Sequence, residues 1–397
     1  MVVVVGMGAD GLAGLAPAVR DRVLAAPVVV GGPRHLALLP DVPGQERRAW
    51  PSPFTVDGVP ADALVLASGD PLVSGVATTL VRRLGADAVE VVPHVSSVAL
   101  ARARMRWSAE ESTALTVVGR RVERVLRELA PGRRLLLLTS DEHTPARVAA
   151  LLVGAGYGAT RMTALADLGA AEESRHEATA AAWDLAVPRL HVLALDLLGP
   201  AGGSVSGSWA AGLPDDAFEH DGQLTKRDVR ASALARLRPQ PGQRLLDLGA
   251  GAGSVAIEWA RAHPTCRATA VEREAERAAR IARNAARLGV PDLEVVHGDV
   301  LASVRAVEGL VDAIFVGGGA TAPGLLDACR DRLAPGGRLV VHGVTLETEQ
   351  VLAAAYAAHG GELTRLAVET AAPIGSFTGW TPARAVTQWS WTREEQP

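Results

Sequence analysis

A glycine-rich turn in the second half of the sequence carries the strongest signal for ligand binding. Residues 247–253 read Asp-Leu-Gly-Ala-Gly-Ala-Gly, after an apolar run at 244–248 and before a helical pattern at 255–262. Glycines let the backbone approach a ligand closely, and the start of a helix offers N–H groups without partners. We therefore expect a cofactor to contact the turn formed by Gly249, Ala250, Gly251, Ala252 and Gly253.

Two acidic residues follow the next two apolar runs, at positions that suit the same ligand. Glu272 stands where a carboxylate can bind ribose hydroxyls, and Asp299 stands where it can reach an adenine amino group. The glycine spacing is GxGxG, with Ser254 in place of the last glycine of a dinucleotide motif. Asp247 would repel a pyrophosphate, but it suits the cationic amino-acid end of S-adenosylmethionine. The alternative is an ordinary glycine-rich turn with acids on the surface.

The first half of the sequence also opens on a glycine turn, but its signal is different. Residues 6–11 match GxGxxG, whereas no acid follows the second apolar run at 28–30, which argues against a nicotinamide dinucleotide. Two other loops, at 68–71 and 93–97, follow apolar runs. Open α/β sheets bind ligands at the carboxyl ends of their strands, so these loops are candidate sites. Gly-Asp-Pro is also common in turns, and His94 is more simply a loop histidine.

Parallel strands are needed to present these loops, and short apolar runs alternate with helical stretches along the whole chain. In the first half, the expected strands cover 2–5, 28–30, 64–67, 89–92, 135–138 and 190–195. In the second half, they cover 244–248, 268–271, 293–296, 313–316 and 338–341, with an amphipathic helix at 274–288 and a closing antiparallel strand at 384–392. Continuous apolar runs are typical of strands covered on both faces, so the sequence predicts an α/β fold.

A stretch of small residues at 199–208 divides the chain into two parts of similar length. We expect a first domain at 1–198, a flexible linker at 199–213 and a second domain, built on a doubly wound Rossmann-like sheet, at 214–397. A further break near 108–116 would divide the first domain into two α/β subdomains.

Composition excludes several classes of protein. The 397 residues carry a net charge of −4, which does not suit a nucleic-acid binder, and no apolar run approaches the length of about 20 residues that a membrane span needs. The N-terminus lacks the pattern of a signal peptide, and the two cysteines lie far apart, so we expect a cytoplasmic protein without disulfides or a metal site. Lysine and arginine together number 40, and only Lys226 is a lysine.

Taken together, these motifs resemble the bifunctional precorrin methyltransferases of cobalamin biosynthesis, in which a tetrapyrrole methylase is fused to a Rossmann-type methyltransferase. The matching segments of the first half are 5–8, 30–36, 67–72, 93–98, 144–145 and 168–169. Those of the second half are 215–218, 224–230, 249–253, 317–318 and 344–348. Ala9 departs from the pattern, because members of the family usually carry proline there.

The resemblance implies two S-adenosylmethionine sites, one in each half. In the first half, the cofactor is expected near Ser68, Gly69, Asp70, Ser96 and Ser97, with residues 6–10 facing the tetrapyrrole. In the second half, Thr225, the glycine turn, Glu272 and the backbone at Val300 would hold it. The implied reaction is methylation of a precorrin at C5 by the first half, and methylation at C15 with loss of the C12 acetate carboxylate by the second.

The residues that act on the substrate are less clear from the sequence. Arginine matches the carboxylates of a precorrin, so Arg230 and Arg227 are candidates, although a solvated helix face is an equal alternative. Lys226, Glu347 and Asp10 complete the candidate list, with helix capping as the alternative for Glu347. We expect a small-molecule tetrapyrrole as partner, no nucleic acid or membrane, and a homo-oligomer. A tandem nicotinamide oxidoreductase and a non-catalytic ligand-binding protein remain as alternatives.

Overall fold

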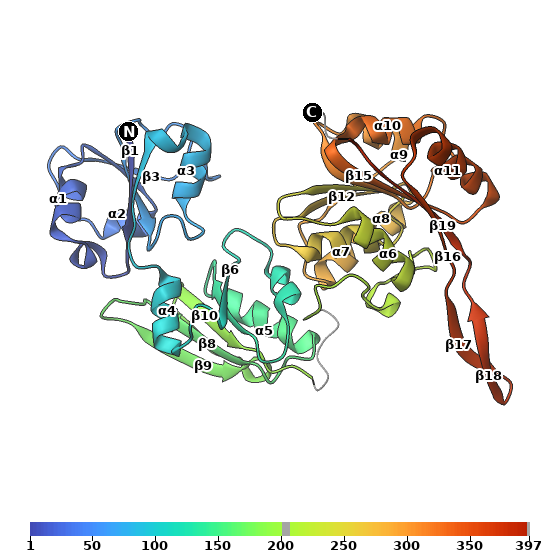
Figure 1. The fold of residues 1–397 in the computed structure, drawn as a ribbon. Helices are drawn as coiled ribbons and strands as arrows, with labels where there is room; N and C mark the ends of the chain where they lie inside the picture. The colour runs from blue at the N-terminus through green and yellow to red at the C-terminus, as the bar shows by residue number, and fades with distance from the viewer. Residues whose placement is uncertain (201–206, 395–397) are drawn as a thin grey trace. The chain divides into compact units, whose positions relative to one another are not determined.

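The computed structural model describes residues 1–200 and 207–394, which form two compact units (Figure 1). The first unit contains residues 1–122 and 131–200, and the second contains 123–130 together with 207–394. The short segment 123–130 belongs to the second unit through contacts such as the hydrogen bond from Arg127 Nε to the carbonyl of Arg261, at 2.9 Å. Residues 201–206, in the predicted linker, lie outside the described residues.

The first unit begins with a five-stranded parallel sheet. Its strand order is β3 (Glu46–Ala49), β2 (Val28–Gly31), β4 (Leu64–Ser68), β1 (Val2–Met7) and β5 (Val89–Val92). The helices of this part are α1 (Pro17–Ala25), α2 (Pro33–Ala37) and α3 (Val76–Leu84). Successive side chains of β1 enter two separate apolar clusters, with Val4 in one and Val5 in the other. This sheet is therefore covered on both faces, as its continuous apolar runs predicted.

A second five-stranded sheet begins inside the stretch 108–116, where the sequence predicted a break. Its order is β6 (Ser112–Thr116), β7 (Arg134–Leu138), β10 (His191–Asp196), β8 (Arg161–Ala166) and β9 (Ser174–Thr179). Only β6 and β7 pair in parallel, and the other pairs are antiparallel. The helices here are α4 (Ser97–Met105) and α5 (Thr144–Gly154). The first unit thus contains two α/β sheets, in line with the expected subdomains.

The second unit is built on one seven-stranded sheet with helices on both faces. Its order is β13 (Glu294–His297), β12 (Arg267–Glu272), β11 (Arg244–Leu248), β14 (Val311–Val316), β15 (Leu333–Gly343), β19 (Val386–Thr392) and β16 (Glu362–Leu366). The helices are α6 (Arg227–Leu237), α7 (Ser254–Ala262), α8 (Ala275–Arg287), α9 (Val300–Ala306), α10 (Leu325–Arg332) and α11 (Leu346–His359). Strands β13 to β15 pair in parallel, and β19 pairs antiparallel to both its neighbours. The predicted doubly wound sheet is confirmed.

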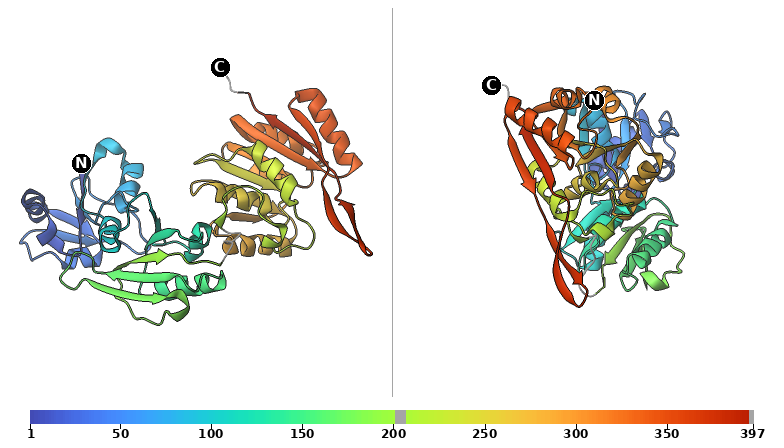
Figure 2. Two further views of the ribbon diagram at one scale, coloured as in Figure 1. Left: turned by 60° about the horizontal axis from the view of Figure 1, so that its bottom comes forward. Right: turned by 90° about the vertical axis from the view of Figure 1, so that its right-hand side faces the viewer.

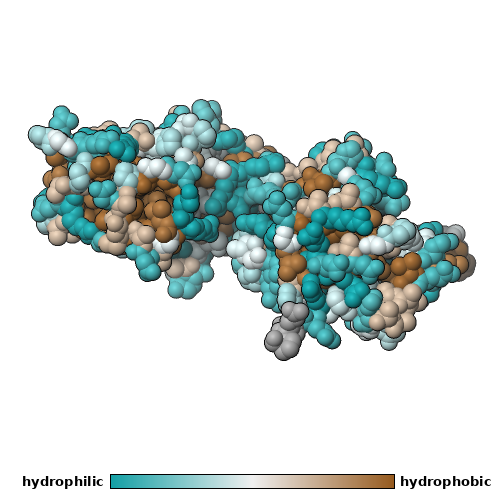
Figure 3. Space-filling model, turned by 90° about the horizontal axis from the view of Figure 1, so that it is seen from above, coloured by the Kyte–Doolittle hydropathy of each residue, from teal (hydrophilic) through white to brown (hydrophobic). Residues whose placement is uncertain are grey.

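A two-stranded hairpin, β17 (Glu369–Ile374) and β18 (Phe377–Pro382), projects from the second unit (Figures 1 and 2). The hairpin exposes Phe377, at its tip, and Trp380, within β18, with 78% and 70% of their surface open. On the face drawn in Figure 3, hydrophilic side chains separate patches of apolar ones. Among the described residues, the helices are all too short or too polar to cross a membrane.

Candidate active sites

The glycine turn of the second unit follows β11 and leads into α7. Gly249, Gly251 and Gly253 all have left-handed backbones, with φ of 71°, 59° and 77°. A Cβ on Gly249 would lie 2.8 Å from the backbone nitrogen of Gly318, and a Cβ on Gly253 would lie 2.6 Å from Cγ2 of Ile281. Both the conformation and the close approach therefore require glycine at these positions.

Glu272 ends β12 beside this turn, and its side chain is held by backbone donors. Its carboxylate accepts hydrogen bonds from the N–H groups of Gly251, at 2.8 Å, and Glu274, at 3.1 Å. The residue is only 5% exposed, yet it lines the cleft in front of the turn. These donors hold the carboxylate at the edge of the cleft, where it can accept further hydrogen bonds from hydroxyl groups.

Asp247 lies directly beneath the turn. One carboxylate oxygen accepts a hydrogen bond from the N–H of Ala256 at 3.0 Å, and the other has no hydrogen-bond partner among the described residues. Burial raises the pKa of Asp247 to about 7, because the surrounding protein disfavours the charged form. The structure therefore places a proton-binding carboxyl group at the base of the turn.

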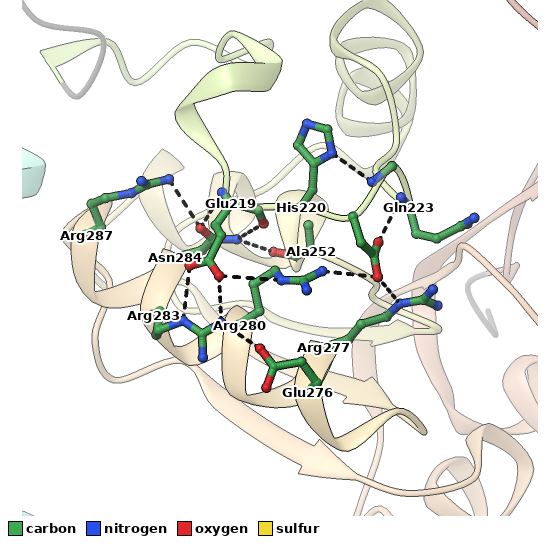
Figure 4. A network of polar contacts seen from close by, with 12 residues as sticks. Glu219, His220, Gln223, Ala252, Glu276, Arg277, Arg280, Arg283, Asn284 and Arg287 are labelled. Atoms are coloured by element: carbon green, nitrogen blue, oxygen red, sulfur yellow. Dashed lines mark hydrogen bonds and ion pairs between the residues drawn. The ribbon is translucent and has the colours of Figure 1, made fainter.

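A polar network on α8 fixes the segment that faces the turn (Figure 4). The buried Asn284 amide donates to the carbonyls of Glu219 and Ala252, at 2.9 and 3.0 Å, and accepts from the N–H of Glu219 at 2.8 Å. Arg277 binds the carboxylate of Asp221 through Nε at 2.8 Å. Residues 219–223 are tied to α8 in this way, and they lie against the glycine turn, since a Cβ on Gly251 would lie 3.0 Å from the carbonyl oxygen of Gln223.

The cleft of the second unit has a volume of about 1160 Å³ and lies at the carboxyl ends of the parallel strands. It brings together nearly all of the predicted cofactor residues of this half: Thr225, Gly249, Ala250, Gly251, Glu272, Asp299 and Val300. Ala252 and Gly253 do not line it, because they lead into α7. Asp299 also caps α9, accepting a hydrogen bond from the N–H of Ala302 at 2.9 Å.

The structure separates the predicted substrate residues of this half. Lys226 and Arg227 line the cleft, and Lys226 Nζ lies 3.5 Å from the carboxylate of Asp215. Arg230 is fully buried and absent from the cleft wall. Its guanidinium binds Glu258 at 2.6 Å and the carbonyl oxygen of Thr225 at 2.5 Å. We therefore revise the expectation for Arg230, which positions Thr225 and does not face a substrate in this structure.

Glu347 lies in the first turn of α11, which Thr345 caps by accepting a hydrogen bond from the N–H of Thr348 at 3.3 Å. Hydrogen bonds from its own backbone N–H and from the Thr345 hydroxyl hold the pKa of Glu347 below its usual value. Glu347 does not line the cleft, and its contacts are those of a residue at the start of a helix, which was the alternative to a substrate contact.

Arg384 and His342 are among the cleft residues that the sequence analysis did not select. Arg384 precedes β19 and adds a cation to the cleft that Lys226 and Arg227 also line. His342, near the end of β15, is 8% exposed and lies in the floor of the cleft. Both residues could have been found from their positions, because His342 lies near the carboxyl end of β15 and Arg384 lies just before β19, at the same edge of the sheet as the glycine turn.

In the first unit, the ends of β1, β4 and β5 meet as the sequence predicted. A Cβ on Gly6 would collide with the carbonyl oxygen of Gly69 and would lie 2.8 Å from the backbone nitrogen of His94. Gly69 itself faces Ser96 and Ser97, since its Cβ would lie 3.1 Å from Cα of Ser96 and 3.3 Å from N of Ser97. The two predicted cofactor loops are therefore in contact. A pocket of about 470 Å³ beside them is lined by residues that include Gly6 and His94.

The remaining predicted residues of the first unit lie near this junction. The Ser96 hydroxyl caps α4 at 3.1 Å from the N–H of Ala99, and the Asp70 carboxylate accepts from the N–H of Leu72 at 2.9 Å. The Ser68 hydroxyl accepts a hydrogen bond from Arg34 at 3.1 Å. Asp10 does not line the pocket, and its buried Oδ1 has no hydrogen-bond partner in the described part of the chain.

Among the described residues, no group of three His, Cys, Asp or Glu side chains is arranged to hold a metal ion. The polar groups at both sites include backbone N–H groups, hydroxyls and carboxylates, and the cleft of the second unit also presents the cations Lys226, Arg227 and Arg384. Such groups suit an organic ligand with hydroxyl and amino groups.

Family models cover most of the chain. The model of the tetrapyrrole (corrin/porphyrin) methylases matches residues 1–183, and that of the precorrin methyltransferase domain matches residues 216–393. A precorrin-6Y C(5,15)-methyltransferase (decarboxylating) from Sinorhizobium sp is 44% identical over 397 residues, which is 98% of this chain and 96% of that protein. A protein with the same name from Mycobacterium tuberculosis is 44% identical over 407 residues, covering 99% of this chain and 100% of its own.

Shorter relatives match part of the chain. The cobalt-precorrin-6B C(15)-methyltransferase (decarboxylating) of Salmonella typhimurium is 33% identical over 158 residues, or 38% of this chain and 80% of that protein. The crystal structure of the C-terminal domain of precorrin-6Y C5,15-methyltransferase from Rhodobacter capsulatus is 41% identical, with a TM-score of 0.44. It covers 47% of this chain and 100% of that one.

Proposed function

The chain belongs to the precorrin-6Y C5,15-methyltransferase (decarboxylating) family, and from this premise we propose that it methylates precorrin-6Y at C5 and C15. The reaction includes loss of the C12 acetate carboxylate and belongs to cobalamin biosynthesis. The observation that carries the proposal is the cleft of the second unit, which is lined by Thr225, by Gly249 and Gly251 of the glycine turn, and by Glu272.

S-adenosylmethionine fits the donors and acceptors of this cleft, and it supplies an electrophilic methyl group when bound. The left-handed glycines leave the turn free of Cβ atoms, so the backbone can lie against the cofactor. Glu272 would accept hydrogen bonds from the ribose hydroxyls, since two backbone N–H groups already orient its carboxylate toward the cleft. Thr225 and the backbone at Val300 would complete the contacts.

The proposal includes a second cofactor site in the first unit, near the junction of Gly69 with Ser96 and Ser97. Its support is the close approach of these two loops at the ends of neighbouring parallel strands, where α/β sheets place ligands. We assign C5 methylation to this unit and C15 methylation with decarboxylation to the second. The Salmonella relative, which matches only 38% of this chain, is named for the C15 and decarboxylating steps alone, which agrees with a division of the reactions between separate parts of the chain.

The acidic side chains of the substrate need cations in a protein of net charge −4. Lys226, Arg227 and Arg384 gather positive charge on the cleft wall, and arginine can bind a carboxylate through two parallel hydrogen bonds. These contacts would hold the ring with a nucleophilic carbon in line with the methyl group. Because the conjugated ring supplies the nucleophile, no strong protein base is required for transfer.

Decarboxylation breaks the bond between the acetate CH2 and its carboxylate, and the electron pair passes into the conjugated ring as CO2 leaves. The CH2 carbon then takes up a proton from solvent as the electron pair returns, and it becomes a methyl group. Removal of water around that carboxylate favours the step, because the charge is better dispersed in the product. The cleft offers apolar surface for this purpose at Val344, Leu366 and Val386. We place the acetate against these residues.

We also propose that the enzyme works in the cytoplasm. Cys266 and Cys329 are both buried free thiols, which agrees with a reducing compartment. The nicotinamide alternative is disfavoured by the GxGxG turn and by the family match.

The direct test is to incubate the protein with S-adenosylmethionine and precorrin-6Y and to record the mass of the product. We expect a gain of two methyl groups and the loss of one CO2. An unchanged substrate mass, under conditions in which the Sinorhizobium relative turns over, would refute the proposed function.

A further inference from the structure

His342 is a cleft residue of the second unit that lies between the predicted cofactor residues and an apolar wall. It stands near the carboxyl end of β15, between the glycine segment 317–319 that follows β14 and the start of β19. Along this edge of the sheet, the glycines border the cofactor side of the cleft, whereas Val386 and Leu366 border the apolar side. His342 therefore lies where the cofactor side of the cleft meets the apolar wall.

One nitrogen of the imidazole is fixed by a neighbouring strand. His342 and Gln388 are direct partners across β15 and β19, and Nε2 of His342 lies 2.9 Å from Oε1 of Gln388. Gln388 is fully buried, and its amide nitrogen donates to the Thr364 hydroxyl at 3.4 Å. An amide oxygen only accepts hydrogen bonds, so Nε2 of His342 carries the proton and donates it.

The other nitrogen is left as an acceptor. Nδ1 has no hydrogen-bond partner in the described part of the chain, and it is not among the fully buried polar atoms. The small exposed surface of His342 belongs to a residue that lines the cleft. Burial lowers the pKa of His342 to about 4, which keeps the ring neutral and the Nδ1 lone pair free near pH 7.

Packing holds the ring in this orientation. The imidazole meets the ring of Phe315 edge to face, with centroids 4.9 Å apart and an interplanar angle of 87°. The Gln388 contact and the Phe315 contact together leave little freedom for the ring to turn. An acceptor fixed in this way is selective, because it binds N–H donors and repels the lone pairs of carboxylates.

We propose that His342 is a substrate-binding residue, whose Nδ1 accepts a hydrogen bond from an N–H group of the tetrapyrrole ring. The inference rests on the proposed function and assigns different parts of the substrate to different residues of the cleft. The cations Lys226, Arg227 and Arg384 bind the acidic side chains of the substrate. His342 binds the tetrapyrrole ring itself, because it accepts a hydrogen bond from one pyrrole-type N–H in the cleft. An N–H that donates to an acceptor also leaves its ring richer in electrons, which assists attack of a ring carbon on the methyl group.

Three substitutions separate this role from a structural one. His342→Asn keeps an acceptor near the place of Nδ1, His342→Gln keeps a donor toward Gln388 but no acceptor at Nδ1, and His342→Leu keeps neither. His359→Gln serves as the matched control, because His359 lies at the end of α11 and outside the cleft. Thermal unfolding of each variant checks that the fold is retained.

The readouts are the Kd of precorrin-6Y, from the absorbance of the tetrapyrrole, the Kd of S-adenosylmethionine, and kcat/KM. We expect His342→Gln to weaken precorrin binding and kcat/KM by about tenfold, the value of one lost hydrogen bond, with unchanged cofactor affinity. His342→Asn should stay within about threefold of the wild type.

Unchanged precorrin binding in His342→Gln would overturn the inference, and so would an equal loss of cofactor and precorrin affinity in all three variants. Failure of the wild type to turn over precorrin-6Y would instead refute the proposed function. The two failures are therefore distinguishable.

Discussion

The carboxylate of Glu272 accepts a hydrogen bond from the backbone N–H of Gly251 at 2.8 Å, so the acid at the end of β12 and the turn after β11 form one rigid unit. The glycine keeps the turn open, and the acid faces the cleft that the turn borders. We expect this pair to determine how tightly the second unit binds S-adenosylmethionine.

Glu272→Gln tests the acid. The substituted amide offers one accepting oxygen where the carboxylate offers two, and it has no charge. We expect the Kd of S-adenosylmethionine at the second unit to rise by about 10- to 100-fold, the range for loss of a hydrogen bond to a charged group. Calorimetric titration measures this Kd. Glu294→Gln is the control, because Glu294 is exposed and binds Thr269 on the neighbouring strand; equal affinities for the two variants would contradict the role of Glu272.

Arg230 should matter for stability more than for substrate binding. Its guanidinium is fully buried against Glu258, and removal of one partner leaves the other charge unpaired. We expect Arg230→Met to lower the free energy of unfolding of the second unit by about 3–5 kcal/mol. Denaturant titration measures this loss, and a further Glu258→Gln substitution should restore part of it. A variant as stable as the wild type would show that the pair is not needed for folding.

The stability of the second unit should fall as the pH rises toward neutrality. Burial raises the pKa of Asp247 from an ordinary 3.8 to about 7, so between these values the folded unit binds a proton that the unfolded chain has released. The free energy of unfolding therefore decreases with pH over this interval, by up to about 1.4 kcal/mol per pH unit.

Asp247→Asn removes this titration and keeps the shape of the neutral side chain. Denaturation midpoints measured from pH 4 to pH 8 should fall less steeply in the variant, which should be more stable than the wild type at pH 8. Parallel curves for the two proteins would show that Asp247 does not titrate in this range.

Lys226 and Arg384 should govern the affinity for the acidic substrate. We expect Lys226→Ala and Arg384→Ala each to raise the KM for precorrin-6Y several-fold without change in cofactor affinity, because each removes one cation from the cleft wall. Steady-state kinetics at two salt concentrations measures the effect, which should shrink at high salt. Lys226→Arg keeps the charge but changes its shape, so kinetics equal to the wild type would mean that Lys226 contributes charge alone.

Strand ends were the most predictable part of the molecule. Gly249, Gly251 and Glu272 come together because parallel strands present their carboxyl ends at one edge, and short apolar runs reveal those strands in the sequence. The exposed strand β9 and the hairpin β17–β18 were not predicted. Their residues are largely polar or exposed, so they lack the apolar runs that mark strands.

Side-chain direction was the least predictable part. Arg230 is a charged residue beside the cofactor threonine, yet it lies on the buried side of α6 because its partner, Glu258, comes from α7. His342 directly follows the apolar run 338–341, which we predicted as a strand. A histidine at the end of such a run is expected to be a buried core residue, so the sequence does not mark it as a site residue. Only the cross-strand contact with Gln388 gives it a defined proton position.

The central claim is that the glycine turn of the second unit serves C15 methylation and decarboxylation, while the first unit methylates C5. Gly251→Arg tests it directly, because any side chain there starts from a left-handed backbone, 3.0 Å from the carbonyl oxygen of Gln223, and must enter the cleft. Gly309→Arg is the control, since Gly309 has φ of 72° and open space around it.

The deciding measurement is the mass of the product formed from precorrin-6Y by Gly251→Arg. We predict a gain of one methyl group with the acetate carboxylate retained, whereas the Gly309→Arg control gains two methyl groups and loses CO2. A Gly251→Arg product that has gained two methyl groups and lost the acetate carboxylate as CO2 would contradict the account.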